Sequence, residues 1–151
     1  MGGTRCGTLS AVAREARDHL SLRVGTATLE QLDRRARRDA QPKSKLAERY
    51  LREGLQMDDH PGINFVDGAL GRRPAVTGTG LDVWEIVETV RHNDDSIARA
   101  AAYLEIDALL VEVAIRYYGS NREEVDAWIE RVGQIAEEEE TKWLRAREAL
   151  A

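Results

Sequence analysis

The stretch that most constrains the fold of this chain runs from Leu20 to Val24, where apolar and polar side chains alternate with a period of two. This alternation is typical of a half-buried β-strand. Three side chains of the strand would face a core: Leu20, Leu22 and Val24. Three others would face outward, all on one side: His19, Ser21 and Arg23.

Two amphipathic helices are predicted directly after this strand. The first has apolar residues at helical spacing, namely Leu29, Leu32 and Ala36. Pro42 begins the second helix, where its missing N–H costs nothing. The apolar stripe of the second helix is Leu46, Tyr50, Leu51 and Leu55. So short a segment cannot bury a core alone, and the simplest partner for the strand is the same strand of a second copy.

A two-stranded antiparallel ribbon made by such a dimer fits the major groove of DNA. The N-terminus of the second helix offers N–H groups and a partial positive charge to a phosphate oxygen. We therefore expect Lys43 and Ser44, in its first turn, to anchor phosphates. The first helix also carries a run of arginines, which is either a solvated face or a further phosphate contact: Arg34, Arg35, Arg37 and Arg38.

The charge of the chain divides between its two parts. Residues 1–57 carry a net charge of +5 and residues 58–151 a net charge of −10, which together give −5. Attraction to DNA phosphates therefore belongs to the first part, and the acidic second part would repel DNA.

Residues 19–57 resemble the ribbon-helix-helix family of bacterial repressors and antitoxins. The resemblance is carried by the strand 20–24, by Leu29-Glu30-Gln31-Leu32-Asp33, by Pro42-Lys43-Ser44-Lys45-Leu46-Ala47 and by Leu51. That family often has a glycine before its second helix, where this chain has Ala40-Gln41-Pro42. The outward strand residues of the family contact base edges, which implies this role for His19, Ser21 and Arg23. Arg23 suits guanine, because a guanidinium can bond O6 and N7 together. The alternative is a strand in an ordinary α+β domain.

The residue pattern of the sequence changes after a polar linker at residues 58–62. Two short apolar runs, 63–66 and 73–76, predict a small β-hairpin that turns at Gly68 and Gly71. Three short helices follow at 81–92, 97–104 and 107–118, and are typical of a helix-turn-helix-like bundle.

This part resembles a small antitoxin-associated domain of unknown function, found in bacteria and archaea beside PIN-like ribonuclease toxins. The matching strings are His60-Pro61-Gly62-Ile63, Arg73-Pro74-Ala75-Val76-Thr77-Gly78-Thr79 and Val83-Trp84-Glu85-Ile86-Val87. That family commonly continues Gly-Thr-Arg-Ile, where this chain has Gly78-Thr79-Gly80-Leu81. The third helix offers only Glu112 and Arg116 as long polar groups, so we expect it to pack against itself or a partner rather than enter a groove.

Residues 121–151 form an acidic segment with helical periodicity. A block of like charge, Glu137 to Glu140, precedes a more basic end. This tail is either a solvated terminal helix or a docking segment anchored by Trp143 and Leu144. Nucleases of the PIN type use clustered carboxylates and a metal, and an antitoxin can block such a site with arginine. Arg145 and Arg147 are the candidates for this toxin-binding role.

Nothing in the sequence predicts an enzyme, a cofactor or a metal site. The three histidines, residues 19, 60 and 92, lie in different predicted elements without metal-binding spacing. A single cysteine, Cys6, and the lack of a signal peptide or a membrane-spanning apolar run favour the cytoplasm. Residues 1–18 are a tag remnant, an upstream mis-start or a flexible, partly helical arm that touches phosphates.

The sequence therefore predicts a mainly α protein in two parts. A ribbon-helix-helix dimer at 19–57 precedes a helix-turn-helix-like domain at 63–120, with a small β-hairpin, and a helical tail at 121–151. The resemblances imply a VapB-like type II antitoxin, which represses its own operon at operator DNA and neutralises a PIN-like ribonuclease toxin. The alternatives are a ribbon-helix-helix transcriptional regulator without a toxin, whose acidic domain serves oligomerisation, and a structural adaptor without a DNA role.

Overall fold

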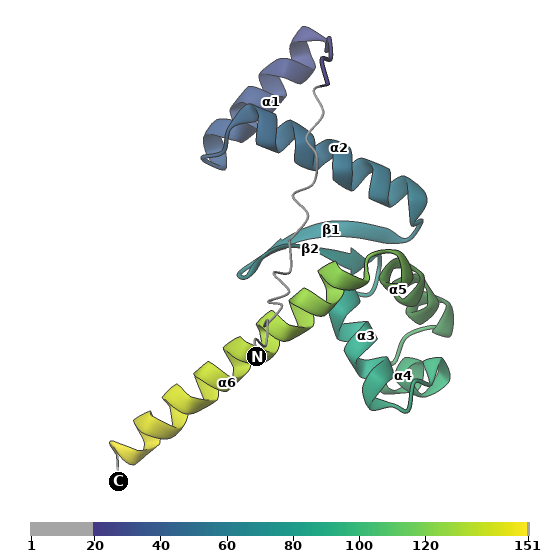
Figure 1. Ribbon diagram of the computed structural model, residues 1–151, viewed down its shortest axis with the longest axis vertical. Coiled ribbons are helices and arrows are strands. Elements are labelled where there is room, and N and C mark those ends of the chain that lie inside the picture. Colours follow the sequence, from purple (N-terminus) through teal and green to yellow (C-terminus); the bar gives the residue numbers. More distant parts are fainter. Residues whose placement is uncertain (1–19, 151) are drawn as a thin grey trace, which may run out of the picture. The chain divides into compact units, whose positions relative to one another are not determined.

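The computed structural model describes residues 20–150, so the expectations for His19 and for the arm at 1–18 lie outside the described residues. The chain is mainly helical with one small antiparallel sheet, as predicted (Figure 1). The helices are α1 (Thr26–Arg38), α2 (Lys43–Asp59), α3 (Val83–His92), α4 (Ile97–Leu104), α5 (Ala108–Ser120) and α6 (Arg122–Glu148). The strands are β1 (Ile63–Gly68) and β2 (Gly71–Val76). The chain divides into two compact units, residues 1–41 and residues 42–151.

In the first unit, residues 20–25 are neither helix nor strand, and α1 follows them. The helix ends through Ala40, whose φ of +50° lies in the left-handed region. The Gln41 N–H then donates to the Ala36 carbonyl at 3.0 Å, which closes the last turn. Left-handed backbone costs a residue with a Cβ about 1–2 kcal/mol. Ala40 thus occupies a position that suits the glycine expected from the ribbon-helix-helix resemblance.

The second unit is built on the β1–β2 hairpin, which has the position and the antiparallel pairing that the sequence predicts. Its register pairs Ile63 with Val76 and brings Gly68 opposite Gly71 at the turn. Gly71 has a φ of +119°, a conformation that favours glycine. Ile63 and Val76, at the open end of the hairpin, are buried in the core.

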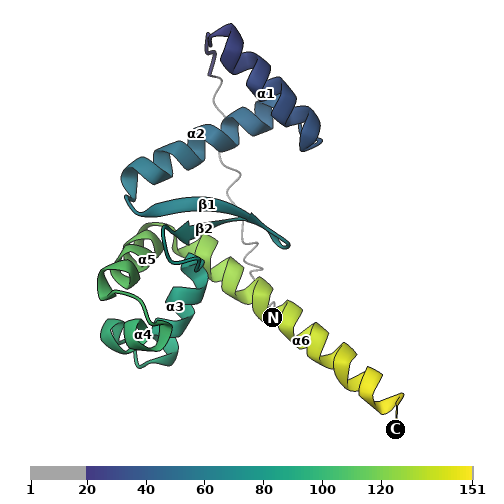
Figure 2. The same ribbon diagram turned by 180° about the vertical axis from the view of Figure 1, so that it is seen from behind.

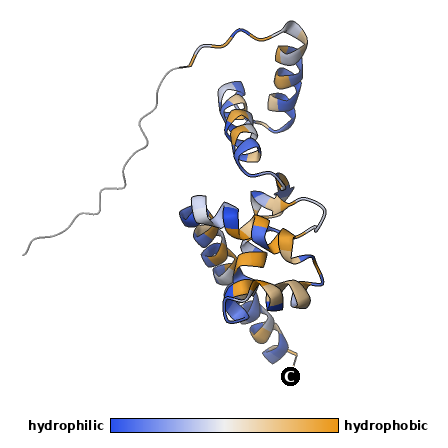
Figure 3. Cartoon of the chain, turned by 90° about the vertical axis from the view of Figure 1, so that its right-hand side faces the viewer, coloured by the Kyte–Doolittle hydropathy of each residue, from blue (hydrophilic) through white to orange (hydrophobic). Residues whose placement is uncertain are grey.

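Helices α3, α4 and α5 pack against one another, and their buried apolar residues make up most of the core. Figure 3 colours the hydrophobic residues along the ribbon orange. Each of these helices is preceded by a residue whose side chain can cap the N-terminus of the helix. Asp82 and Glu85 form a capping box at α3, Ser96 caps α4, and Asp107 caps α5. The buried members of the core are Ile63, Val76, Val83, Ile86, Val87, Val90, Ala100, Ala101, Val111, Ala114, Tyr117 and Val125.

Asp82 also fastens the bundle to the hairpin. Its buried carboxylate accepts hydrogen bonds from the Arg73 guanidinium on β2 and from the Trp84 indole N–H, the latter at 3.0 Å. A backbone bridge joins Ala75 to Asp82 beside them. The start of α3 is therefore fixed by both its capping box and the hairpin.

Helix α2 belongs to this second unit. Glu53, only 5% exposed, accepts two hydrogen bonds from Arg72 on β2, at 2.6 and 2.7 Å. Further along, Asn121 donates to Gln56 at 3.3 Å, and the rings of His60 and Tyr117 meet edge to face at 5.0 Å. Contacts from Arg72 on β2, Tyr117 on α5 and the cap residue Asn121 thus hold the C-terminal end of α2.

Two boundaries therefore differ from the sequence prediction. Helix α2 continues through Asp59, which leaves residues 60–62 as the connection instead of 58–62. The boundary between the units falls before Pro42, within the segment 19–57 that was expected to be one domain. The physical reason is that Glu53 of α2 accepts two hydrogen bonds from Arg72 of β2, which joins the helix to the hairpin of the second unit.

Helix α6 changes character along its length. Its first turns pack on the core through Val125 and Ile129, and Arg91 donates to Asp126 at 2.6 Å. From residue 136 onward every described residue is exposed. Both opposed views show this distal half extending away from the bundle (Figures 1 and 2). No helix among residues 20–150 has the length and apolar character needed to cross a bilayer.

Candidate functional site

The first candidate surface is the run at residues 20–24, whose side chains the structure leaves exposed to solvent. Leu20, Leu22 and Val24 are 68%, 59% and 51% exposed. The run is neither coiled into a helix nor buried as an inner strand of the described chain. These three apolar side chains are therefore not part of the core that the described chain forms. The dimeric ribbon itself requires a second copy and stays a prediction.

The predicted base-contacting residues Ser21 and Arg23 are exposed on this run. Helix α1, beside them in sequence, presents Arg34 and Arg37 to solvent. Two further arginines are engaged locally, because Arg35 and Arg38 both donate to Asp39, at 3.0 and 3.3 Å. Desolvation tends to raise the pKa of Asp39, but these two hydrogen bonds outweigh it, and the net pKa lies below its usual value. The exposed arginines remain the stronger candidates for phosphate contact.

The predicted phosphate anchors lie at the start of α2. Lys43 and Ser44 are exposed in the first turn, directly after Pro42. No side chain caps this helix end. The N–H groups and the positive end of the helix dipole therefore point toward the surface that Lys43 and Ser44 line, which suits an anionic oxygen.

The predicted apolar stripe of α2 is covered only at its first member. Leu46 is fully buried, whereas Tyr50, Leu51 and Leu55 are 42%, 46% and 65% exposed. The face that α2 turns toward the hairpin instead carries Glu53, which the sequence interpretation missed. A Glu at a buried helix position has no sequence signal of its own, because its partner Arg72 lies on a distant strand.

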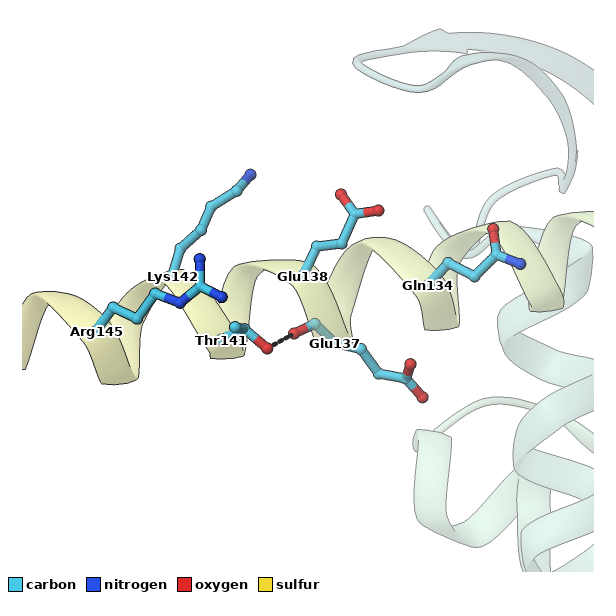
Figure 4. Close-up of a pocket in the computed structure, with 6 residues that line it drawn as sticks. All are labelled: Gln134, Glu137, Glu138, Thr141, Lys142 and Arg145. Carbon is cyan, nitrogen blue, oxygen red and sulfur yellow. Dashed lines mark hydrogen bonds between the residues drawn. The ribbon is translucent and has the colours of Figure 1, made fainter.

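The tail residues proposed to bind a toxin gather on the distal part of α6. Trp143 and Leu144 are 56% and 46% exposed. The Arg147 guanidinium lies 4.8 Å from the centre of the Trp143 ring, and Arg145 is exposed nearby. Figure 4 shows that the hollow in this region is lined from one helix alone, so it is an open surface rather than a cleft. Such a surface suits docking to another protein more than binding a small molecule.

Helix α5, the third helix of the bundle, carries few long polar groups. Its long polar groups, Arg116 and Glu112, lie 3.7 Å apart as an ion pair. A shallow hollow of about 280 Å³ borders it, lined by Asp59, His60, Pro61, Val113 and Arg116. Within residues 20–150, no cluster of His, Cys, Asp or Glu is arranged to hold a metal ion.

Comparison with known proteins adds no relative. The sequence matches no protein-family model, no curated protein and no solved structure.

Proposed function

We propose that this protein is a type II antitoxin that acts in the cytoplasm as a dimeric DNA-binding repressor. Residues 20–24 of two copies would form the ribbon, and the tail would hold a PIN-like ribonuclease toxin inactive. One observation carries the proposal: the alternating apolar side chains of 20–24 are exposed next to an arginine-rich helix. No catalytic role is assigned to any residue.

Burial of the apolar side would supply the energy of dimerisation. Leu20, Leu22 and Val24 are each more than half exposed, and complete burial of such side chains contributes about 1.5–3 kcal/mol each. Strand pairing would also satisfy the backbone N–H and C=O groups of the run. The ribbon would then present Ser21 and Arg23 on its opposite face.

The DNA role is tested by a gel shift on the DNA upstream of the coding sequence, at physiological salt. Arg23→Ala should weaken binding by about 1–3 kcal/mol and relax base preference at one position. Lys43→Ala should weaken binding to all sequences and lower the salt dependence by about one phosphate contact. Arg99→Ala, on the exposed part of α4, is the matched control and should bind as the unmodified chain does. Absence of a shift at physiological salt would favour the adaptor hypothesis.

The toxin role is tested separately through the tail. Coexpression with the product of the adjacent gene should give a stable complex in which ribonuclease activity is suppressed. Removal of residues 137–151 should restore that activity while operator binding persists. A neighbour that does not bind and stays active would reject the antitoxin role, and would leave the second candidate, a transcriptional regulator whose acidic domain oligomerises.

A further inference from the structure

The hollow beside α5 brings together two short stretches of the second unit. Asp59, His60 and Pro61, at the end of α2, form one wall, and Val113 and Arg116 of α5 form the other. Its volume of about 280 Å³ lies just below the range of pockets for drug-sized ligands, which is about 300–1,000 Å³. A ligand held there would therefore have the size of a single amino acid rather than that of a nucleotide.

The walls of the hollow are fixed by contacts within the second unit. The His60 ring meets the Tyr117 ring edge to face at 5.0 Å, and the His60 carbonyl accepts a hydrogen bond from the Ile63 N–H at 3.1 Å. Gly62 passes so close to α5 that a Cβ at this position would lie 3.2 Å from a methyl group of Val113. The hollow is thus formed before any ligand binds, which lowers the entropic cost of binding.

The wall at the end of α2 is acidic, an arrangement that the C-terminal end of a helix disfavours. Helix α2 ends with Asp58 and Asp59, and no basic side chain lies in its last turn. Because this end of a helix carries a partial negative charge, the two carboxylates are unfavourable there and a cation beside them is favourable. Among residues 20–150, no hydrogen bond or ion pair holds the Asp59 carboxylate. The Asp59 wall therefore suits an ammonium group.

The opposite wall carries a positive charge. The Arg116 side chain is 65% exposed, and its ion pair with Glu112 is long, at 3.7 Å. A guanidinium has five N–H donors, so Arg116 can bind a second carboxylate through two parallel hydrogen bonds. Val113 and Pro61 add apolar surface to the two walls. The hollow thus combines an acceptor for a cation, donors for an anion and an apolar contact.

We propose that this hollow binds a free α-amino acid with an apolar side chain, such as leucine. The ammonium group would meet Asp59, the carboxylate would meet Arg116, and the side chain would contact Val113 and Pro61. Asp59 disfavours a simple anion and Arg116 disfavours a simple cation, so the two charges together select a ligand that carries both. The site is separate from the phosphate anchors at the other end of α2, and it does not depend on the proposed function.

Titration of the full chain with leucine, followed by amide NMR spectra, tests the site. The amide signals of His60, Gly62 and Val113 should shift together and saturate with a Kd in the millimolar range, because the hollow covers only part of the ligand. Inorganic phosphate at the same concentration should leave these three signals in place. Absence of saturable shifts with leucine, or equal shifts with phosphate, would overturn the proposal.

Two blocked ligands test which charge of the ligand meets which wall. Leucinamide lacks the carboxylate and N-acetylleucine lacks the ammonium group, so each should bind about tenfold more weakly than leucine. Arg116→Gln should weaken the binding of leucine about tenfold but should not weaken that of leucinamide. Asp59→Asn should weaken the binding of leucine to a similar extent but should not weaken that of N-acetylleucine.

Arg99→Gln on α4 is the matched control, because its side chain is also 65% exposed and paired with a carboxylate, that of Asp94. This variant should bind leucine as the unmodified chain does. Blocked ligands that bind as tightly as leucine would contradict the proposed site, and so would unchanged leucine binding by Asp59→Asn or Arg116→Gln. Operator binding is measured separately on the same variants, so a failure of the proposed DNA-binding function and a failure of this site give different results.

Discussion

The bundle of the second unit and residues 20–24 of the first unit both contain regularly spaced apolar residues, but only those of the bundle are buried. Val83, Ile86, Val111 and Tyr117 are fully buried by the elements around them. The apolar residues at 20–24 are each more than half exposed. The distal part of α6 likewise leaves Trp143 and Leu144 exposed, at 56% and 46%.

This difference separates apolar residues that close the fold from those that the described chain leaves exposed. The spacing in the sequence is equally regular in both regions, so periodicity alone does not distinguish them. What distinguishes them is whether the same chain supplies a second apolar layer. In the second unit the hairpin and four helices supply it, and the run at 20–24 has none within the described chain.

The largest effect is expected where the core is closed. Ile86→Ala should lower the free energy of unfolding of the second unit by about 2–5 kcal/mol, through lost burial and a cavity. Leu22→Ala should change it by less than about 0.5 kcal/mol, because that side chain is exposed. Urea titration followed by tryptophan fluorescence measures both, since Trp84 and Trp128 lie in the second unit. Similar losses of unfolding free energy in the two variants would contradict the difference between the buried bundle and the exposed run at 20–24.

The next effect concerns the attachment of α2. Glu53→Ala removes the carboxylate that accepts two hydrogen bonds from Arg72 and leaves that guanidinium only its exposed partner Asp67, so it should destabilise the second unit by roughly 2–3 kcal/mol. Glu53→Gln keeps the volume of the side chain and one hydrogen-bond acceptor, so it should lose less stability than Glu53→Ala. The exposed Arg99–Asp94 pair is the control, and Arg99→Ala should cost at most about 1 kcal/mol. Equal effects of Glu53→Ala and Arg99→Ala in urea would show that α2 is not fastened in this way.

A smaller effect is expected at high pH. Burial raises the pKa of Tyr117 well above its usual value, and Glu124, which accepts its hydrogen bond at 2.9 Å, adds to this shift. The phenol ionises at about pH 10 in the unfolded chain but stays neutral at that pH in the folded chain. The contribution of Tyr117 to the free energy of unfolding is therefore fully present below about pH 10 and falls as the pH rises above it. Tyr117→Phe should cost about 1 kcal/mol at pH 7 and reduce the alkaline loss. Parallel pH curves for the two proteins would exclude Tyr117 as a source of that loss.

The smallest effect concerns the end of α1. Ala40→Gly should raise the free energy of unfolding by about 1 kcal/mol at most, because glycine adopts the left-handed backbone of this position without strain. The gain is limited because glycine also has more conformational freedom in the unfolded chain. Thermal denaturation of the full chain measures the change. A clear loss of stability would show that the turn does not adopt this conformation in solution.

Local signals predicted most of the second unit. The turn glycines gave the hairpin, and α4 spans 97–104 as expected. Helix α3 begins at Val83 rather than at residue 81, because the Asp82–Glu85 capping box sets its start and leaves Leu81 outside. Local chemistry is sufficient where a cap or a turn residue lies next to the boundary that it determines.

The attachment of α2 could not be predicted in the same way. It depends on Arg72, which meets Glu53 only after the hairpin has folded, and a Glu ordinarily indicates a solvated position. The candidate site has a similar limit. The sequence identifies Ser21, Arg23, Lys43 and Ser44, and the structure shows each of them exposed, but the proposed dimer that would bring them to DNA involves a second copy, which one sequence does not describe.

Amide hydrogen exchange of residues 20–25 in the full chain tests the central claim most directly, because strand pairing protects backbone N–H groups. The proposed ribbon predicts slow exchange at concentrations where the chain is dimeric, fast exchange on dilution, and fast exchange at every concentration in Leu22→Glu. Fast exchange of these amides in the dimeric, unmodified chain would contradict the ribbon and the repressor function built on it.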